Sequence, residues 1–286
     1  MEPQPPAVLI TGTSTGIGAA CALALDRQGF LVLAGVRKEE DAQRLRARAS
    51  LRLQTLMLDV TDEAGIRAAA QTVGDRVGEA GLAGLVNNAG ILVPGPLELV
   101  AIDQLRRQLE VNVIGQVAMV QAFLPLLRRR RGRIVGIGSI AGRLAPPYLG
   151  AYAASKAAVE SMTDCLRVEL RTWGIHVALV EPDSVDTPIW EKLQAEADRL
   201  DANVSPEVRA LYDRDILEMR KAGMRMDRAG MPVDRVVRAV HHALTAKHPK
   251  TRYPIGWRTR LGFRLLPGLP DRLRDWIMLR FMGVRA

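Results

Sequence analysis

The sequence predicts an α/β protein built on a doubly wound parallel sheet, with three layers in the order helix, sheet, helix. Two observations predict this fold class. Short apolar runs alternate with segments of helical periodicity from residue 7 to residue 181. The apolar runs have apolar residues at consecutive positions, so both faces of each strand are expected to be buried, as in a parallel sheet covered on both sides.

Each element follows from this alternation. Strands are expected at Ala7–Thr11, Phe30–Gly35, Gln54–Leu58, Gly84–Asn87, Arg133–Ser139 and His176–Glu181. Helices are expected between them, at Gly16–Gln28, Glu39–Ala49, Glu63–Ala80, Ala101–Arg128 and Ala151–Trp173. Pro125 is expected to kink or shorten the fourth helix, because proline cannot donate the hydrogen bond of a helix interior.

The remaining chain is less regular. The polar, partly helical segment Ser184–Gly230 is expected to form a lid, followed by an amphipathic helix at Val233–Ala246 and a last strand at Thr251–Gly256. No internal repeat or low-complexity linker divides the chain. We therefore expect one domain over residues 1–286, with its core at 7–190 and 233–256, a substrate lid at 184–230 and a basic amphipathic tail at 257–286.

Composition excludes several classes of protein. The chain has 286 residues and a net charge of +9, but only two cysteines, Cys21 and Cys165. No disulfide framework is implied, which favours a reducing compartment such as the cytoplasm. The four histidines and two cysteines lack metal-ligand spacing, so no metal site is expected. Neither a signal peptide nor a membrane-spanning helix is expected.

The tail combines basic and apolar side chains. Between Arg252 and Ala286 there are eight arginines, interleaved with residues such as Trp257, Phe263 and Trp276. This composition fits a helix that lies on an anionic membrane surface. The alternative is a C-terminal helix that packs on the domain or on a second subunit. No nucleic-acid partner is expected, because no recognisable reading motif accompanies the charge.

A glycine-rich turn lies between the first strand and the first helix. Its backbone can approach a pyrophosphate closely, and the helix N-terminus supplies N–H groups and a positive dipole. Strand, turn, helix and second strand together indicate a Rossmann-type dinucleotide site, although an ordinary tight turn would look similar. The residues expected at the cofactor are Gly12, Ser14, Thr15, Gly16, Ile17 and Gly18.

The residues at the ends of the second and third strands suggest which dinucleotide binds. The second strand is followed by Arg37 and Lys38, with no acid before Glu39, and an arginine there suits the 2′-phosphate of NADP. The alternative is a solvated Arg37 and a site that accepts NAD as well. Asp59 ends the third strand, where it could accept from the adenine amino group or cap a helix. Further cofactor contacts are expected at Val60, Asn88, Ala89 and Gly90.

A proton-handling pair is expected at Tyr152 and Lys156. They are four residues apart in an alanine-rich segment, so they would share a helix face. Free tyrosine has a pKa of about 10, and a nearby cation lowers it toward the range useful for general acid–base catalysis. The pattern alone is common by chance, and a surface lysine beside a half-buried tyrosine would produce it too. Ser139, thirteen residues before Tyr152, ends another strand.

Taken in order, these motifs resemble the short-chain dehydrogenase/reductase family. The resemblance rests on Thr11–Gly18, Asp59, Asn87–Gly90, Asn112, Ser139, Tyr152 with Lys156, and Glu181–Thr187, and it covers about residues 7–190. It implies that Tyr152 is the general acid–base and that Lys156 lowers the pKa of Tyr152 and binds the nicotinamide ribose. It also implies that Ser139 bonds the substrate oxygen and that Asn112 holds a water linking Lys156 to solvent. From the residues alone, Asn112 could equally be a buried structural amide, and Ser139 a strand-end cap.

One position departs from the family pattern. The family usually has Pro-Gly after the sixth strand, where this chain has Pro182 and Asp183. Asp183 adds bulk and negative charge, so we predict that Asp183→Gly tightens NADP binding. The resemblance places Val185 and Thr187 at the carboxamide and the phosphates, beside Pro182 and Asp183.

The resemblance also suggests a substrate. Residues 170–177 and 187–190 look like the branch that acts on steroids, retinoids and 3-hydroxybutyrate, and the apolar lid favours a lipophilic alcohol or ketone. The expected activity is an NAD(P)-dependent interconversion of a secondary alcohol and a ketone. A nucleotide-binding sensor without turnover and a peripheral membrane protein are the alternatives. The family implies a homodimer or homotetramer formed through the helices at 101–128 and 151–173.

Overall fold

A seven-stranded parallel sheet forms the centre of the protein in the computed structural model, which describes residues 5–187, 205–228 and 230–282. The strands lie in the order β3-β2-β1-β4-β5-β6-β7. Their bounds are β1 Ala7–Ile10, β2 Leu31–Val36, β3 Leu53–Met57, β4 Gly84–Asn87, β5 Arg133–Ile137, β6 His176–Pro182 and β7 Arg252–Ile255. The order in which strands are added reverses between β1 and β4, and because these two strands are parallel their carboxyl ends lie beside each other.

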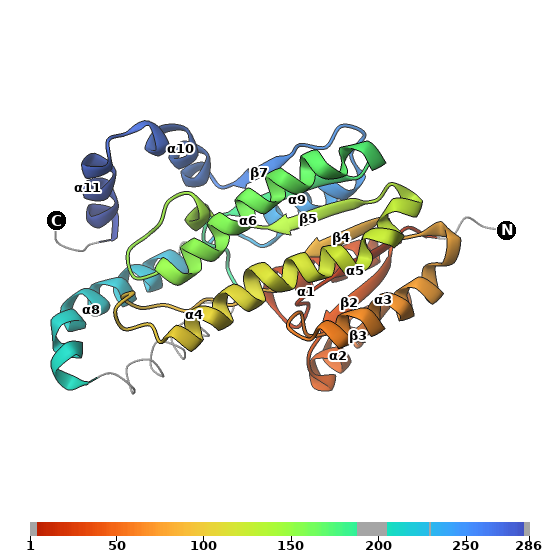
Figure 1. The fold of residues 1–286 in the computed structure, drawn as a ribbon, viewed down its shortest axis with the longest axis horizontal. Helices are drawn as coiled ribbons and strands as arrows, with labels where there is room; N and C mark the ends of the chain where they lie inside the picture. The colour runs from red at the N-terminus through yellow and green to blue at the C-terminus, as the bar shows by residue number, and fades with distance from the viewer. Residues whose placement is uncertain (1–4, 188–204, 229, 283–286) are drawn as a thin grey trace.

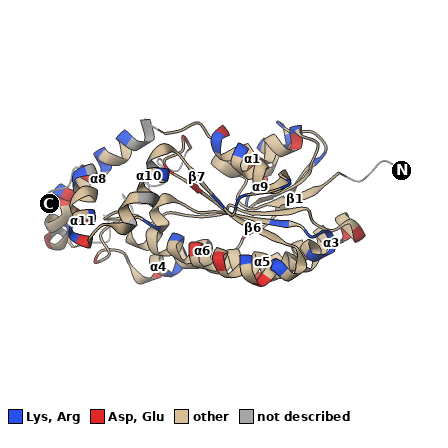
Figure 2. Ribbon diagram, turned by 90° about the horizontal axis from the view of Figure 1, so that it is seen from above, with Lys and Arg blue, Asp and Glu red and all other residues tan. Residues whose placement is uncertain are grey.

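Helices cover both faces of this sheet, as Figures 1 and 2 show. One face carries α1 (Gly16–Arg27) and α9 (Asp234–Thr245), with α2 (Glu39–Arg46) at its edge. The other carries α3 (Glu63–Val77), α5 (Gly115–Arg130) and α6 (Gly150–Glu169). Because each strand has a helix layer on either side, side chains such as Val8, Leu9 and Ile10 are all fully buried.

The predicted fold class is confirmed, and most element bounds differ from the expected ones by one to three residues. The largest difference is at the end of the fifth helix, whose last turn is the 3₁₀ helix η4 (Leu170–Trp173), and the third helix likewise ends in a 3₁₀ turn, η1 (Gly78–Ala80). The predicted fourth helix is one continuous helix made of α4 (Ile102–Leu109), a π-helical turn η2 (Glu110–Ile114) and α5.

Pro125 does not shorten this long helix, contrary to expectation, because α5 continues to Arg130. The hydrogen bond that proline cannot make would end at the carbonyl of Gln121, and both residues are exposed, so water can satisfy that carbonyl. By length and composition, Ile102–Arg130 is the single helix among the described residues that could cross a membrane. Here Met119, Phe123 and Leu127 are fully buried against the sheet, so it is a core helix of this fold.

The C-terminal part adds three helices at the carboxyl ends of the strands. The lid segment contains α8 (Pro206–Arg228), and the tail forms α10 (Trp257–Leu265), a 3₁₀ turn η5 (Leu266–Gly268) and α11 (Asp271–Met282). Figure 1 shows these helices gathered at the end of the molecule opposite the N-terminus. The part of the predicted lid at 188–204, with Trp190, lies outside the described residues.

Candidate active site

The glycine-rich turn is fastened to the ends of its neighbouring strands. The Thr11 hydroxyl accepts from the backbone N–H groups of Asn88 (3.0 Å) and Ala89 (2.9 Å), and the Asn88 amide donates to the Thr11 and Gly12 carbonyls at 2.8 and 3.0 Å. On the other side, Thr13 donates through both its backbone N–H and its hydroxyl to the Gly35 carbonyl, each at 3.0 Å. The turn is therefore held at the carboxyl edge of β1, β2 and β4.

Glycine is required in this turn for steric reasons. A Cβ on Gly18 would lie 2.3 Å from the Gly12 carbonyl oxygen, and one on Gly12 would lie 2.8 Å from the Ala89 Cα. Gly12 and Gly16 also have positive φ angles of 67° and 60°, which side chains disfavour. With no acid in the first turn of α1, the N–H groups of that helix suit a pyrophosphate. The residues present therefore fit a dinucleotide.

Thr187 lies beside the same turn, although it is 171 positions from Gly16 in sequence. A Cβ on Gly16 would lie 3.4 Å from the Thr187 Cβ. Val185 is buried and pairs with Met231 as an isolated parallel bridge. The structure thus brings the predicted segment after β6 to the predicted glycine-rich turn.

Asp183 lies where β6 leaves the sheet. Its backbone N–H donates to the Ile255 carbonyl at 3.3 Å, and its Cβ lies 3.5 Å from the position of a Cβ on Gly256. The side chain is half-buried at the corner between β7 and α10. The effect of this acid on cofactor binding stays a prediction.

The second and third strands end at a cavity of about 360 Å³. Arg37 lies 3.9 Å from Asp59 across it, and Asp59 also accepts from the backbone N–H of Thr61 (3.0 Å) and its hydroxyl (2.8 Å). Asp59 therefore caps a turn, and α3 starts later, after Asp62. The cavity is lined by Arg37, Asp59, Thr61, Arg106, Arg107, Glu110 and Val111.

Sequence reasoning missed the contribution of α4 to this cavity. Arg106 and Arg107 are adjacent in sequence and lie six and five residues before Asn112. That spacing could have placed them near the cofactor once Asn112 was assigned to the site. Arg106 is also paired with Asp103 at 2.8 Å.

The Asn112 side chain is fully buried in the π-helical turn, and both its carbonyl oxygen and its amide nitrogen are hydrogen-bonded. Its carbonyl oxygen accepts from the Ile91 N–H at 2.8 Å, and its amide donates to the Ile91 carbonyl and to Ser155, both at 3.0 Å. Ser155 in turn donates to the Tyr152 carbonyl at 2.7 Å. The side chain is therefore a structural amide that ties the segment after β4, η2 and α6 together, while a water-binding role for Asn112 stays a prediction.

Ser139, Tyr152 and Lys156 meet between β5 and α6. Ser139 follows β5 and accepts from the Ala141 N–H at 3.2 Å, so it also caps the short 3₁₀ helix η3 (Ile140–Gly142). Lys156 is buried, and its amine donates to the Ile137 carbonyl at 2.7 Å. The amine lies 5.7 Å from the centre of the Tyr152 ring. All three side chains thus converge at the carboxyl end of β5.

Burial has the largest effect on the pKa values of Tyr152 and Lys156. It raises the pKa of Tyr152, while a hydrogen bond with Ser139 acts in the opposite direction. Burial lowers the pKa of Lys156 to about 8. The expected lowering of the Tyr152 pKa by Lys156 stays a prediction, because the amine is bonded to Ile137 in this arrangement. A phenol beside a second hydroxyl and a buried amine can hold and move one proton at a substrate oxygen.

Comparisons with known proteins agree with this geometry. A family profile described as short chain dehydrogenase matches residues 6–198. The chain is 38% identical to mouse retinol dehydrogenase 5 over 283 residues, which cover 96% of this chain and 89% of that protein. It is also 38% identical to bovine 17-beta-hydroxysteroid dehydrogenase type 6 over 279 residues, with coverage of 96% and 87%.

Solved structures give the same result. A short chain dehydrogenase from Burkholderia cenocepacia in complex with NADP superposes with a TM-score of 0.73 at 26% identity, covering 98% of this chain and 99% of that one. A short chain dehydrogenase/reductase from Burkholderia phymatum in complex with NAD has a TM-score of 0.74 at 26% identity, with coverage of 88% and 90%. The predicted resemblance is confirmed: the chain belongs to the short-chain dehydrogenase family and is an oxidoreductase that acts on CH–OH groups.

Proposed function

We propose that this enzyme interconverts a lipophilic secondary alcohol and its ketone, on a steroid-, retinoid- or lipid-like substrate, with NADP as the preferred cofactor and NAD as the alternative. The observation that carries the proposal is the meeting of Ser139, Tyr152 and Lys156 at the end of β5. Two relatives are named as dehydrogenases of retinol and of 17-beta-hydroxysteroids, and these names support the substrate class.

The roles follow from the chemistry of each side chain. A bound nicotinamide carries the hydride, so the protein must supply a proton and hold the oxygen. Tyr152 exchanges the proton with the substrate oxygen, and the Ser139 hydroxyl donates a second hydrogen bond to that oxygen. Lys156 binds the nicotinamide ribose and, when charged, favours the tyrosinate.

The cofactor preference is supported by the cavity at the ends of β2 and β3. Arg37 is largely exposed there, and Arg106 and Arg107 line the same cavity. A guanidinium binds a phosphate through a forked pair of hydrogen bonds. Asp59 and Glu110 oppose this preference electrostatically, which is why NAD is kept as the alternative.

Tyr148 supports a substrate site between the body and α8. Its φ of 64° is unusual for a bulky residue, and its hydroxyl donates to Asp215 of α8 at 2.7 Å. Such strained backbone tends to persist where a binding site holds it in place. The loop Leu144–Leu149 therefore joins the Ser139 region to the lid helix, and we assign it to the substrate site.

Turnover of NADPH with a panel of lipophilic ketones tests the proposal. Tyr152→Phe should lower kcat by at least about 100-fold, the contribution typical of a general acid–base, while NADPH still binds. Ser139→Ala should lower kcat by about 100-fold, as loss of an oxyanion donor does. Ser161→Ala, on the exposed side of α6, is the matched control and should keep full activity. Unchanged kcat in Tyr152→Phe would refute the assignment.

A surface role for the tail is supported by its exposed side chains. Trp257 and Trp276 are 69% and 50% exposed, and Leu261, Leu265 and Leu273 accompany them on α10 and α11. Figure 2 shows basic residues along α8 and α11 at the same end of the molecule. The alternative also has support, because Thr259 of α10 is fully buried and α11 contacts α8. We propose a cytoplasmic enzyme that associates peripherally with anionic membranes.

Co-sedimentation with anionic vesicles tests this surface role. The double variant Trp257→Ser with Trp276→Ser should reduce binding by about tenfold or more, since each buried tryptophan contributes over 1 kcal/mol. Trp173→Ser removes a 46%-exposed tryptophan remote from the tail and should bind as the wild type does. Equal binding by all three proteins would contradict the proposal.

A homodimer or homotetramer through α4, α5 and α6 is the remaining proposal. Ile102, Ile114 and Val168 are 51–69% exposed on these helices. Exposed apolar side chains on one helix layer favour a subunit contact. In the double variant Ile114→Glu with Val168→Glu, the particle mass measured by light scattering should fall to half of the wild-type mass or to the mass of a monomer. An unchanged mass would place the interface elsewhere.

A further inference from the structure

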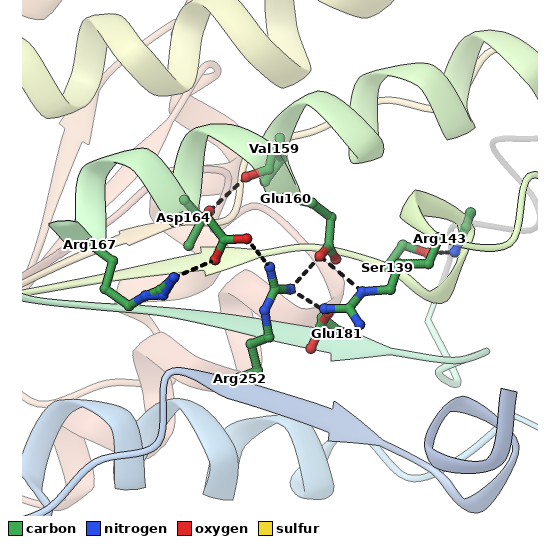
Figure 3. Close-up of polar contacts among 10 residues, drawn as sticks. Ser139, Arg143, Val159, Glu160, Asp164, Arg167, Glu181 and Arg252 are labelled. Carbon is green, nitrogen blue, oxygen red and sulfur yellow. Dashed lines mark hydrogen bonds and ion pairs between the residues drawn. The ribbon is translucent and has the colours of Figure 1, made fainter. Parts of the chain in front are cut away.

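A cluster of partly buried acidic and basic side chains lies beside the Ser139 loop (Figure 3). Three acidic side chains, Glu160 and Asp164 of α6 and Glu181 of β6, face three guanidinium groups. Arg252 of β7 contacts all three acids, at 2.7 Å to Asp164 and 2.9 Å to Glu181, with a shorter contact to Glu160. Arg167 pairs with Asp164 at 3.0 Å. Glu181 is fully buried, so the arrangement is fixed by the fold.

Arg143 is the member of this cluster that belongs to the Ser139 loop. It follows η3 directly, four residues after Ser139. Its Nε lies 3.1 Å from Glu160, and its terminal nitrogen lies 3.4 Å from Glu181. Glu160 is one helical turn beyond Lys156, and Glu181 directly precedes the Pro182–Thr187 segment. One side chain thus joins the serine loop to both elements that border the reacting centre.

The backbone of the loop packs against the same helix. A Cβ on Gly142 would lie 3.0 Å from the carbonyl carbon and oxygen of Lys156. On its outer side, the Arg143 guanidinium lies 4.4 Å from the centre of the Phe263 ring of α10. The loop is therefore enclosed between α6 and α10, and its distance from α6 fixes where the Ser139 hydroxyl lies.

We propose that Arg143 is a positioning residue for the reaction: by bridging Glu160 and Glu181, it holds the Ser139 loop at the distance from Tyr152 that a substrate oxygen requires. This rests on the proposed role of Ser139. Hydrogen-bond donors in an active site tolerate little displacement, because a shift of about 1 Å can cost roughly 100-fold in rate. The two contacts of Arg143 join the loop to α6 and to β6 at the same time.

Arg252 provides the matched comparison. It contacts the same Glu160 and Glu181 carboxylates, but it comes from β7 and is not attached to the Ser139 loop. Removing Arg143 leaves Arg252 to compensate these acids, so the variant is expected to fold. Removing Arg252 takes away the cation that joins α6, β6 and β7, and should mainly reduce stability.

The experiment compares Arg143→Met with Arg252→Met by single-turnover hydride transfer from NADPH and by thermal unfolding. Arg143→Met should slow hydride transfer roughly 30-fold, with the Kd for NADPH within about twofold. Arg252→Met should lower Tm more than Arg143→Met, with hydride transfer within about threefold of wild type. Arg143→Lys should recover only part of the rate, because an ammonium cannot bridge two acidic side chains as a planar fork does.

A double-mutant cycle with Ser139→Ala distinguishes positioning from a general structural effect. In the Ser139→Ala background, Arg143→Met should slow the reaction by less than about twofold, because its effect acts through the missing hydroxyl. A full 30-fold loss in that background, or equal rate losses in Arg143→Met and Arg252→Met, would overturn the proposal. An unchanged rate in Arg143→Met with the expected loss in Ser139→Ala would overturn it while leaving the proposed function intact. Full activity in Ser139→Ala would overturn both.

Discussion

The region around Tyr152 and the region formed by α8, α10 and α11 are held in place in different ways. Backbone groups hold the first, since Lys156 bonds the Ile137 carbonyl and Asn112 bonds both backbone groups of Ile91. Side-chain tips hold much of the second, as in the Tyr148–Asp215 bond, and Leu211 and Met224 of α8 remain exposed. The chemistry therefore rests on a rigid frame, while the surface proposed to meet the substrate can adapt.

The largest expected effect tests the rigid frame at Asn112. Asn112→Leu should lower the free energy of unfolding by about 4 kcal/mol, because it removes three hydrogen bonds and leaves the Ile91 N–H without its partner, while the Ile91 carbonyl keeps the Gln108 amide. Gln104→Met is the control on the same helix, since its buried Oε1 has no partner among the described residues. It should cost less than about 1 kcal/mol. Urea denaturation measures both, and equal losses would show that the frame does not depend on Asn112.

The next prediction concerns the pH dependence of the ion-pair cluster. Burial, followed by the neighbouring Glu160, raises the pKa of Glu181 to about 8 from an ordinary value of 4.5. Below pH 4.5 both the folded and the unfolded chain hold the proton. Between pH 4.5 and 8 only the unfolded chain releases it, so the stability that Glu181 provides at low pH is lost as pH rises through this window, at about 1 kcal/mol per pH unit.

Comparison with Glu181→Gln isolates the contribution of Glu181 to the pH dependence of the unfolding free energy. The amide cannot titrate, so its unfolding free energy should fall less steeply between pH 5 and 8 than that of the wild type. Lys156 acts in a separate window, because its lowered pKa of about 8 makes the folded state relatively more stable as pH rises from 8 to 10.5. Parallel curves for wild type and Glu181→Gln from pH 5 to 8 would show that Glu181 stays ionised in the folded protein.

The cofactor cavity lies at the edge of the rigid frame, and a substitution there should have an intermediate effect on cofactor binding. Arg37→Glu should raise the KM for NADPH roughly 30-fold, corresponding to about 2 kcal/mol for a lost charge-assisted contact, and change the KM for NADH by less than about threefold. Arg48→Glu, which changes an exposed charge beyond the end of α2, is the control. Equal KM changes for both cofactors in Arg37→Glu would show that Arg37 does not select the 2′-phosphate.

Tyr148→Phe tests the adaptable region. It removes the bond to Asp215 and should loosen α8 by about 1 kcal/mol, the typical net value of a hydrogen bond. We expect faster hydrogen exchange in α8 and a two- to fivefold change in substrate KM, with kcat nearly constant. A large fall in kcat would mean that α8 belongs to the rigid frame after all.

The smallest effect is expected for Asp183→Gly. Removing the half-buried carboxylate should tighten NADP binding by about threefold, since a solvent-screened like-charge interaction is worth less than about 1 kcal/mol. Fluorescence titration compares the two dissociation constants. Equal constants would show that the side chain, beside Gly256, does not affect the cofactor.

The sequence predicted the rigid frame far better than the adaptable region. Consecutive apolar residues mark buried strands, and Gly12 and Gly18 mark a turn where no Cβ fits, so local patterns were enough. The Glu160–Arg252 pair joins positions 92 residues apart, and no periodicity encodes such a pairing. The π-helical turn at Asn112 was missed as well, because it arises from packing against Ile91 and Ser155 and has no distinct residue pattern.

The outer edge of the sheet has one further consequence. Thr251 and Ile255 of the β7 region direct their carbonyls toward β6, so Pro254 between them faces outward. Pro254 has no N–H to donate, and its carbonyl already accepts from Arg260 at 3.3 Å. A strand from another molecule would find no backbone N–H and an occupied carbonyl at Pro254. Pro254 therefore disfavours a contact between copies of the enzyme in which one sheet extends into the next at this edge.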